Sequence, residues 1–332
     1  MSAGESLQVK QLSVRLGGRD LVREVSFTVG AGEAYGLVGE SGSGKSMTCK
    51  AVLGLLPVGA VSSGEILLGQ TSLLSLPPAG LQKVRGSAIA MVFQDPMAAL
   101  NPVLRVGDAI AQVIRSHRRV SRGKAREQAV AAMQRVGILD AINRSRSYPH
   151  QFSGGMRQRI MIAMALAAEP RLLLADEPTT ALDVIVQAEI LRLLDTLRRE
   201  IGMSLLLVSH DLSIIAGMCS RVAVMYAGQI VEEGPTEAVL RRPRHPYTQA
   251  LLNSHPEDPT PGRLRSIAGN PPEPHELPPG CAFNPRCTFA TLECRAGPIA
   301  LEPISPEHLT RCIHHHLLAA ADSTLAPAKE RA

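Results

Sequence analysis

Near-alternation of apolar and polar residues characterises the start of the chain. Apolar side chains recur on one side from Leu7 to Val14 and again from Val25 to Val29, which predicts two strands that are each buried on one face. A third segment, Ile66 to Leu68, has a similar character and stops at Gly69. Strands of this kind are typical of the antiparallel edge of a larger fold.

Four later apolar runs are continuous instead of alternating, at residues 34–38, 89–93, 172–175 and 205–208. Continuous runs of this length predict strands that are buried on both faces. Helical patterns separate them: one from Met47 to Leu56, one that ends near Ala168 and one that ends near Arg199. Strands that alternate with helices in this way favour an α/β fold.

The middle of the chain is helical over a longer stretch. One helical pattern starts at Val106 and another covers residues 125–136, with its apolar residues on one face. Both fit a helical subdomain, at about 96–168, that is inserted into the α/β core. We therefore predict a core domain at 1–240 and a smaller C-terminal unit at 241–332.

Composition narrows the classes of function. The chain has 332 residues, a net charge of +5, 3% aromatic residues and no Trp. Few aromatic rings are available to stack on bases, which argues against a nucleic-acid-binding module. No apolar run reaches the roughly 18 residues that a membrane span needs. The first residues do not resemble a secretion signal, so we expect a cytoplasmic protein that reaches a membrane only through partners.

Residues Gly39 to Ser46 match the phosphate-binding pattern G-x-x-x-x-G-K-[ST], between a predicted strand and a predicted helix. Glycines let such a loop turn its N–H groups toward phosphate oxygens. Lys45 supplies a cation to the β- and γ-phosphates, and the Ser46 hydroxyl binds Mg²⁺. The sequence therefore predicts a nucleotide site whose contacts are Gly39, Ser41, Gly42, Gly44, Lys45 and Ser46.

Polar residues also follow three other predicted strands. Asp176 and Glu177 end one strand; beside Mg²⁺ and a nucleoside triphosphate, Asp176 can bind the metal through water while Glu177 polarises the attacking water. Gln94 is a candidate ligand of Mg²⁺ or of that water, and His210 is close enough in principle to contact the γ-phosphate. Taken alone, Gln94 and His210 are also typical of ordinary loop residues.

Ser153, Gly154 and Gly155 precede a long predicted helix. A serine cap and the free N–H groups of a helix start make a second candidate anion site. A plain helix cap is the alternative for this stretch by itself.

In order and spacing, these motifs resemble those of the ATP-binding subunits of ABC transporters, and the resemblance covers essentially the whole chain. It identifies these segments: Gly39 to Ser46 as Walker A, Gln94 as the Q-loop, Phe152 to Arg159 as the signature, Asp176 and Glu177 as Walker B, Ala181 to Asp183 as the D-loop and His210 as the switch histidine. It implies that two such domains enclose two ATP molecules head to tail. The residues that then contact the ATP of the opposite domain are Ser153, Gly154, Gly155 and Asp183.

The resemblance also assigns roles. It implies that Glu177 is the general base, that His210 stabilises the γ-phosphate and that Ser46, Gln94 and Asp176 hold Mg²⁺.

Two positions depart from the family pattern. Met156 stands where the signature usually has Gln, a variant that looks like the one in peptide importers. Leu16 stands at the position of an aromatic that stacks on adenine, which should weaken adenine binding by up to ~1 kcal/mol.

The C-terminal unit resembles the extension of oligopeptide, dipeptide and nickel importer ATPases, in the segments 245–252 and 280–287. Residues 95–102 look like those of the first of the two ATPases that such systems carry. The resemblance implies a heterodimer with a second ATPase, two membrane permeases and an external solute-binding protein. It places the chain on the cytoplasmic face of the inner membrane, held there by the permeases.

Four of the six cysteines cluster in a proline-rich segment: Cys281, Cys287, Cys294 and Cys312. In a reducing compartment, four soft ligands suggest a metal site rather than disulfides. The spacing lacks the C-x-x-C pairs of a usual zinc ribbon, so we favour a [4Fe–4S] cluster, by ligand softness and by this extension's family resemblance. Zn²⁺ and the absence of any metal remain alternatives.

The predicted function is ATP hydrolysis that powers import of peptides or a related small solute. One alternative is a soluble ABC ATPase of a multiprotein enzyme complex, as in phosphonate breakdown, which shares the same core motifs. Another is a nucleotide-dependent metal sensor built around the cysteines. The sequence does not identify the transported solute.

Overall fold

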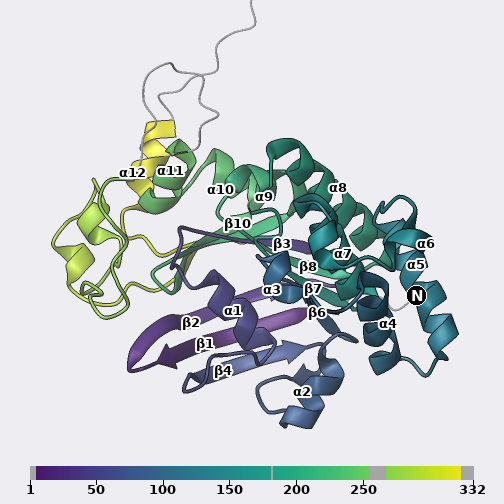
Figure 1. Ribbon diagram of the computed structural model, residues 1–332. Helices are drawn as coiled ribbons and strands as arrows, with labels where there is room; N and C mark the ends of the chain where they lie inside the picture. The colour runs from purple at the N-terminus through teal and green to yellow at the C-terminus, as the bar shows by residue number, and fades with distance from the viewer. Residues whose placement is uncertain (1–4, 181, 255–266, 323–332) are drawn as a thin grey trace, which may run out of the picture.

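The computed structural model describes residues 5–180, 182–254 and 267–322 (Figure 1). Near the N-terminus lies an antiparallel sheet with the strand order β2-β1-β4-β5. Its strands are β1 (Leu7–Leu16), β2 (Arg19–Val29), β4 (Val61–Leu68) and β5 (Thr71–Ser72). Alternate residues of β1 and β2 are buried, which confirms the predicted one-sided strands.

A second sheet forms the centre of the molecule, in the order β11-β12-β10-β9-β3-β8-β7-β6. Its parallel part consists of β3 (Ala34–Val38), β6 (Ile89–Val92), β7 (Leu172–Asp176), β8 (Ser204–Ser209) and β9 (Arg221–Tyr226). The antiparallel part adds β10 (Gln229–Pro235), β11 (Glu302–Ser305) and β12 (His308–Thr310). The continuous apolar runs of the sequence are the four strands β3, β6, β7 and β8.

Both faces of the central sheet are covered. Leu172 and Leu174 pack in one apolar cluster with β1, β2 and the helix α1 (Lys45–Val52). Their neighbour Leu173 packs in the opposite cluster, with the helices α7 (Gly154–Leu166), α8 (Val184–Ile201) and α9 (Leu212–Met218). Figure 1 shows these layers, with β1, β2 and β4 below the central sheet and α8 and α9 above it. The double burial explains why these strands are apolar without alternation.

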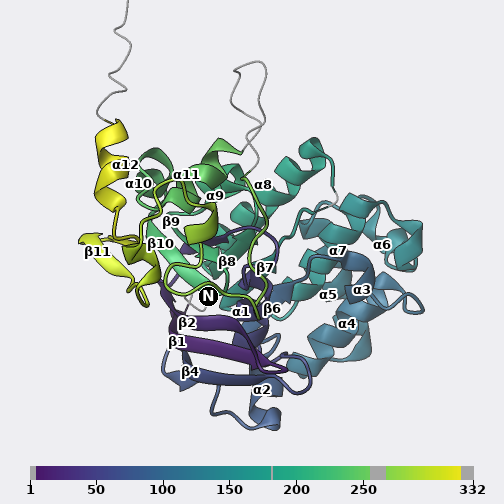
Figure 2. The same cartoon turned by 90° about the vertical axis from the view of Figure 1, so that its left-hand side faces the viewer.

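The segment predicted as a helical subdomain contains α3 (Pro96–Ala99), α4 (Val106–His117), α5 (Arg122–Arg135), α6 (Ala141–Arg144) and the 3₁₀ turn η1 (Pro149–Gln151), followed by α7. These helices project to one side of the sheets (Figures 1 and 2). The short helix α2 (Pro78–Val84) follows β5.

The C-terminal part continues the core instead of standing beside it. The predicted boundary at residue 240 falls within α10 (Thr236–Arg241), which is followed by α11 (Pro246–Asn253), the turns η2 (Asn284–Arg286) and η3 (Glu293–Arg295), and α12 (His315–Asp322). Strand β12 pairs with β10 of the central sheet. Figure 2 labels β10 and β11 on the same side of the molecule, with α12 above them; β12 lies between these two strands in the sheet.

A buried carboxylate holds this junction together. Glu232 in β10 has no exposed surface, and its oxygens accept the backbone N–H groups of Arg244 (2.7 Å) and His245 (2.9 Å) and lie 2.8 Å from His308 Nε2 in β12. The side chain thus joins β10, the start of α11 and β12 at one point.

In the part of the chain that the structure describes, no helix is both long and apolar enough to cross a membrane.

Candidate nucleotide-binding site

The predicted phosphate loop joins β3 to α1, and two of its glycines are required by its shape. Gly39 and Gly44 have φ angles of 152° and 102°, which other residues rarely adopt. A Cβ atom on Gly39 would lie 2.2 Å from the carbonyl oxygen of Met225, and one on Gly44 would lie 2.9 Å from that of Leu21. The loop therefore packs directly against the backbone of β9 and β2.

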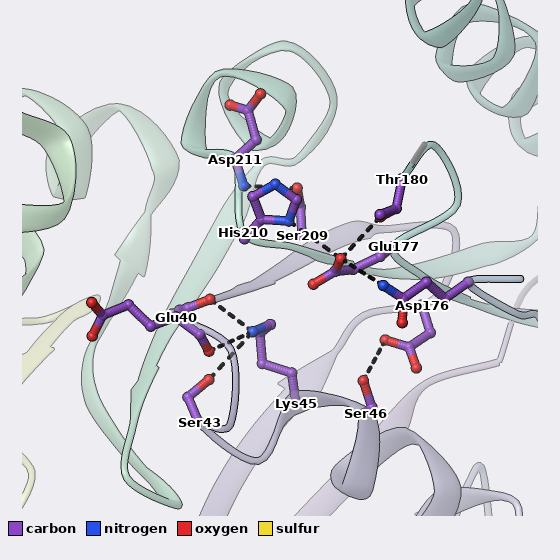
Figure 3. Close-up of polar contacts among 12 residues, drawn as sticks. Glu40, Ser43, Lys45, Ser46, Asp176, Glu177, Thr180, Ser209, His210 and Asp211 are labelled. Carbon is purple, nitrogen blue, oxygen red and sulfur yellow. Dashed lines mark hydrogen bonds and ion pairs between the residues drawn. The ribbon is translucent and has the colours of Figure 1, made fainter. Parts of the chain in front are cut away.

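Lys45 lies within this loop, with 5% of its surface exposed. Its Nζ donates to the carbonyl oxygens of Gly39 (2.7 Å) and Glu40 (2.9 Å) and lies 3.4 Å from Ser43 Oγ (Figure 3). Burial lowers the pKa of Lys45, and the nearby carboxylates oppose that effect. The ammonium group is thus surrounded by oxygens whose place phosphate oxygens can take.

Two of the predicted Mg²⁺ ligands are in direct contact. Ser46 Oγ, at the start of α1, donates to Asp176 Oδ1, at the end of β7, at 2.9 Å (Figure 3). Burial raises the pKa of Asp176, while the hydrogen bond from Ser46 acts to lower it. A hydroxyl and a carboxylate oxygen side by side are ligands of the type that Mg²⁺ prefers.

Glu177 is the centre of the polar contacts at this edge of the sheet. Its Oε2 accepts from Thr180 Oγ1 (2.9 Å) and from the third predicted Mg²⁺ ligand, Gln94, through Nε2 (3.3 Å), and it lies 3.2 Å from His210 Nδ1. The hydrogen bond with His210 lowers the pKa of Glu177 and raises that of His210. Glu177 has a φ of 47°, a strained conformation of the kind found at functional sites.

An open cavity of about 790 Å³ adjoins these groups, within the range of ligand pockets. It is lined by the loop residues 40–47 with Gln94, Glu177 and His210, and by Leu21, Tyr226, Ala227 and Pro271 to Pro274. Leu16, at the end of β1, is not among the described lining residues, whereas Leu21 of β2 is. The contact of Leu16 with adenine stays a prediction.

The residues predicted to act on a second ATP lie elsewhere. Ser153 caps α7 by accepting from Met156 N–H (3.4 Å), and Asp183 caps α8 by accepting from Val186 N–H (2.9 Å). Gly154 and Gly155 form the first turn of α7. None of these four residues is among those that line the cavity. Ala181, also assigned to the D-loop, lies outside the described residues.

Known proteins identify the family. Residues 22–180 match the family described as ABC transporter, and residues 231–294 match the one described as oligopeptide/dipeptide transporter, C-terminal region. The oligopeptide transport ATP-binding protein OppD of Salmonella typhimurium is 46% identical over 292 residues, which are 88% of this chain and 87% of that protein. The chain belongs to the ATP-binding proteins of ABC transporters.

Other relatives and solved structures agree with this membership. The dipeptide transport ATP-binding protein DppD of Haemophilus influenzae is 46% identical to this ABC ATPase. The match covers 87% of the present chain and 89% of DppD. A dimeric ATP-binding cassette, solved in a post-hydrolysis state with ADP and phosphate, superposes with a TM-score of 0.62 at 27% identity, over 69% of this chain and 98% of the other. The predicted family and α/β fold class are confirmed, and so is ATPase activity.

The four clustered cysteines of this ABC ATPase line one small cavity, together with Phe283, Phe289 and Ile313. All are free thiols. Burial raises the pKa of Cys281, while backbone hydrogen bonds from Phe283 and Asn284 act to lower it; burial raises the pKa of Cys312 to about 12. Among the described residues, no group of three or more His, Cys, Asp or Glu is placed to hold a metal ion. The metal assignment is therefore not confirmed.

Sequence reasoning missed one wall of the cavity. Tyr226 and the segment from Pro271 to Pro274 line it, yet neither belongs to a nucleotide motif. Arg286, which contacts the phosphate loop through Glu40, belongs in the sequence to the segment 280–287, which indicates only the importer extension. Its position directly before a clustered cysteine was the single available signal, and that signal pointed to the cysteines instead.

Replacing Glu177 with Gln should lower the pKa of His210. The hydrogen bond with the Glu177 carboxylate is the main cause that raises this pKa, and a neutral amide stabilises an imidazolium less well. In an NMR titration, the His210 ring should therefore titrate at lower pH in Glu177→Gln than in the wild type. Glu189→Gln, on an exposed part of α8, should leave it unchanged. Identical titrations in all three proteins would contradict the contact.

Proposed function

We propose that this ABC ATPase hydrolyses ATP to power the import of peptides through a membrane complex. The observation that carries the proposal is that the phosphate loop, Gln94, Glu177 and His210 line one cavity in a chain whose residues 231–294 match the oligopeptide/dipeptide transporter family. The names of the relatives, OppD and DppD, support peptides as the solute.

The contacts around the cavity support a role for each motif residue. Ser46, Asp176 and Gln94 would hold Mg²⁺, which would supply positive charge against the phosphates. Lys45 binds the β- and γ-phosphates. Glu177, whose pKa is lowered by the His210 hydrogen bond, is ionised at neutral pH and accepts the proton of the attacking water, while His210 stabilises the γ-phosphate.

The second half of each ATP site comes from another ATPase subunit in this proposal. Ser153, Gly154, Gly155 and Asp183 act on the ATP bound by that partner. Next to Asp183, the side chains of Val184 and Ile185 are 80% and 75% exposed, and apolar residues exposed together are typical of an interaction surface. These features support a dimer of ATPase subunits, and the resemblance to peptide importers makes the second subunit a different ATPase.

Exposed apolar residues also flank Gln94. Phe93, Met97 and Val103 are 37%, 43% and 77% exposed, and they supply a surface on which a permease helix can pack. We infer that Gln94 transmits this contact to the ATP site through Glu177. The subunit then lies peripherally at the cytoplasmic face of the membrane, bound to two permeases that receive solute from an external binding protein.

Capture from the native host's detergent-solubilised membranes, without oxygen, tests the complex. We expect mass spectrometry to identify two polytopic permeases and a second ATPase among the co-purifying proteins. A Val103→Asp variant, with a charge in the exposed surface, should recover less permease than Leu292→Asp, an equally exposed position in the extension. Recovery of soluble partners alone would overturn the transport proposal in favour of a soluble enzyme complex.

Glu177→Gln tests the assignment of the general base. The variant should bind MgATP and dimerise like the wild type, because an amide keeps the size of the side chain. Its hydrolysis rate should fall by about a hundredfold or more, the usual contribution of a general base. Glu189→Gln serves as the control for a surface carboxylate. Turnover that survives in Glu177→Gln would rule out this role.

We further propose that Cys281, Cys287, Cys294 and Cys312 hold a [4Fe–4S] cluster. The four thiols border the same small apolar cavity, and backbone N–H groups approach several of the sulfurs, as thiolates in such sites require. A cluster is wider than a single ion, so its ligands are spread further apart than those of Zn²⁺. The proposed role is structural, in a segment with little apolar core of its own.

The double variant Cys281→Ser, Cys287→Ser tests this cluster. Anaerobically purified wild type should contain iron and acid-labile sulfide and absorb visible light, and the double variant should lose all three signals and unfold at lower temperature. Cys219→Ala, which removes a buried thiol outside the cavity, should keep them. Wild-type protein that contains zinc, or no metal, would contradict the proposal, as would a double variant that folds and couples normally.

A further inference from the structure

Arg286 of the C-terminal extension contacts the phosphate loop. Its guanidinium forms a bidentate salt bridge with the carboxylate of Glu40, with Nη1–Oε2 at 2.7 Å and Nη2–Oε1 at 3.0 Å. The Arg286 side chain is 4% exposed and that of Glu40 is 24% exposed. Paired hydrogen bonds between charged groups, in a position largely shielded from solvent, are both strong and directional.

The guanidinium is fixed on its other sides as well. Nε donates to the carbonyl oxygen of Ala268 (2.9 Å), Nη2 lies 3.3 Å from that of Ile267, and Nη1 lies 3.3 Å from Tyr226 Oη. The group also lies over the rings of Tyr226 and Phe283, at 5.8 Å from each ring centre. Arg286 therefore has one defined orientation, aimed at Glu40.

Glu40 is held at three points. Besides the carboxylate, its backbone N–H donates to Tyr247 Oη at 2.8 Å and its carbonyl oxygen accepts from Lys45 Nζ at 2.9 Å. Tyr247 belongs to α11 and Arg286 to η2, so both the backbone N–H and the carboxylate of Glu40 are bound by the C-terminal part of the chain. The position of this loop residue depends on that part.

The same arginine also contacts the chain just before another segment that lines the cavity. The carbonyl groups that it binds, at Ile267 and Ala268, lead into the segment from Pro271 to Pro274, which lines the cavity with Leu21 and Tyr226. Arg286 therefore connects the phosphate loop, through Glu40, to Ile267 and Ala268, the residues that precede the proline segment.

Charge gives the ion pair a second effect. Glu40 lines the cavity and carries a negative charge within the loop that has to receive a triphosphate. Paired with Arg286, this carboxylate is neutralised. If Arg286 is removed, an unpaired carboxylate remains on the loop that has to receive the polyanion, and like charges repel each other more strongly where solvent screening is weak.

We propose that Arg286 is a positioning residue of the ATP site, which neutralises Glu40 and holds the phosphate loop and the proline segment in the geometry that binds ATP. The inference rests on the proposed function, since ATP is taken as the ligand of this cavity. It makes the extension a part of the nucleotide site, with its influence on ATP affinity exerted through one side chain.

Calorimetric titration of the full-length chain with MgATP tests the proposal. Arg286→Gln should raise the Kd for MgATP about tenfold, and in the assembled complex it should raise KM more than it lowers kcat. The double variant Arg286→Gln, Glu40→Gln should recover an affinity within about threefold of the wild type, because the unpaired charge is gone and two amides can still hydrogen-bond. Arg295→Gln, an exposed arginine next to Cys294, is the matched control and should bind like the wild type.

Glu40→Gln alone separates charge from structure, even if Arg286→Gln fails to fold. It keeps an oxygen that accepts from Arg286 and loses the negative charge, so it should bind MgATP more tightly than the wild type. Weaker binding by Glu40→Gln, unchanged binding by Arg286→Gln, or a double variant no better than Arg286→Gln would each overturn the proposal. A wild-type chain that fails to bind MgATP would instead overturn the proposed function itself.

Discussion

The parallel alignment of β3, β8 and β7 is the constraint on which the site depends. Val38 pairs with Ser209, and Asp176 pairs with Val208, so the three strands end at the same level and release their following loops at one edge. Lys45, Glu177 and His210 come from distant parts of the sequence, and this register alone brings them to a common cavity. Because each strand is buried on both faces, a shift of register would misplace two apolar layers at once, which fixes the alignment firmly.

The parts of the structure that follow local rules could be predicted from the sequence. Continuous apolar runs identified the four strands β3, β6, β7 and β8, and polar residues at their ends identified Gln94, Glu177 and His210 as neighbours, since ligands of α/β sheets bind at the carboxyl ends of parallel strands. The contact between Ser46 and Asp176, 130 residues apart, follows from the same rule. The pattern of the phosphate loop predicted that Lys45 belongs to the site, because a phosphate-binding loop requires fixed residue types at fixed spacing.

The pairing of the C-terminal part with the core could not be predicted in the same way. Strand β10 contains Glu232 and Glu233, which the pattern of polarity assigns to the surface, yet both carboxylates are buried because β12, α11 and Arg221 supply their partners. Likewise Arg286 and Glu40 are 246 residues apart, and each is a charged residue of a type that usually lies on the surface. The pattern of apolar residues in a sequence predicts which face of a helix or strand is buried. Which segment covers that face is decided by the tertiary fold.

Two sets of polar contacts, one around the buried Glu232 and one around Arg286, connect the extension to the core. Glu232 joins β12 to the central sheet, and Arg286 joins η2 to the phosphate loop; the proposed cysteine ligands flank both connections, since Cys287 follows Arg286 directly and Cys312 follows β12 by two residues. The proposed cluster, by tying Cys281, Cys287, Cys294 and Cys312 together, would close the chain around β11 and β12 and limit the positions open to Arg286. The cysteine cavity and the nucleotide cavity have no lining residue in common among the described residues, so a cluster there would reach the nucleotide site only through the chain that carries Arg286.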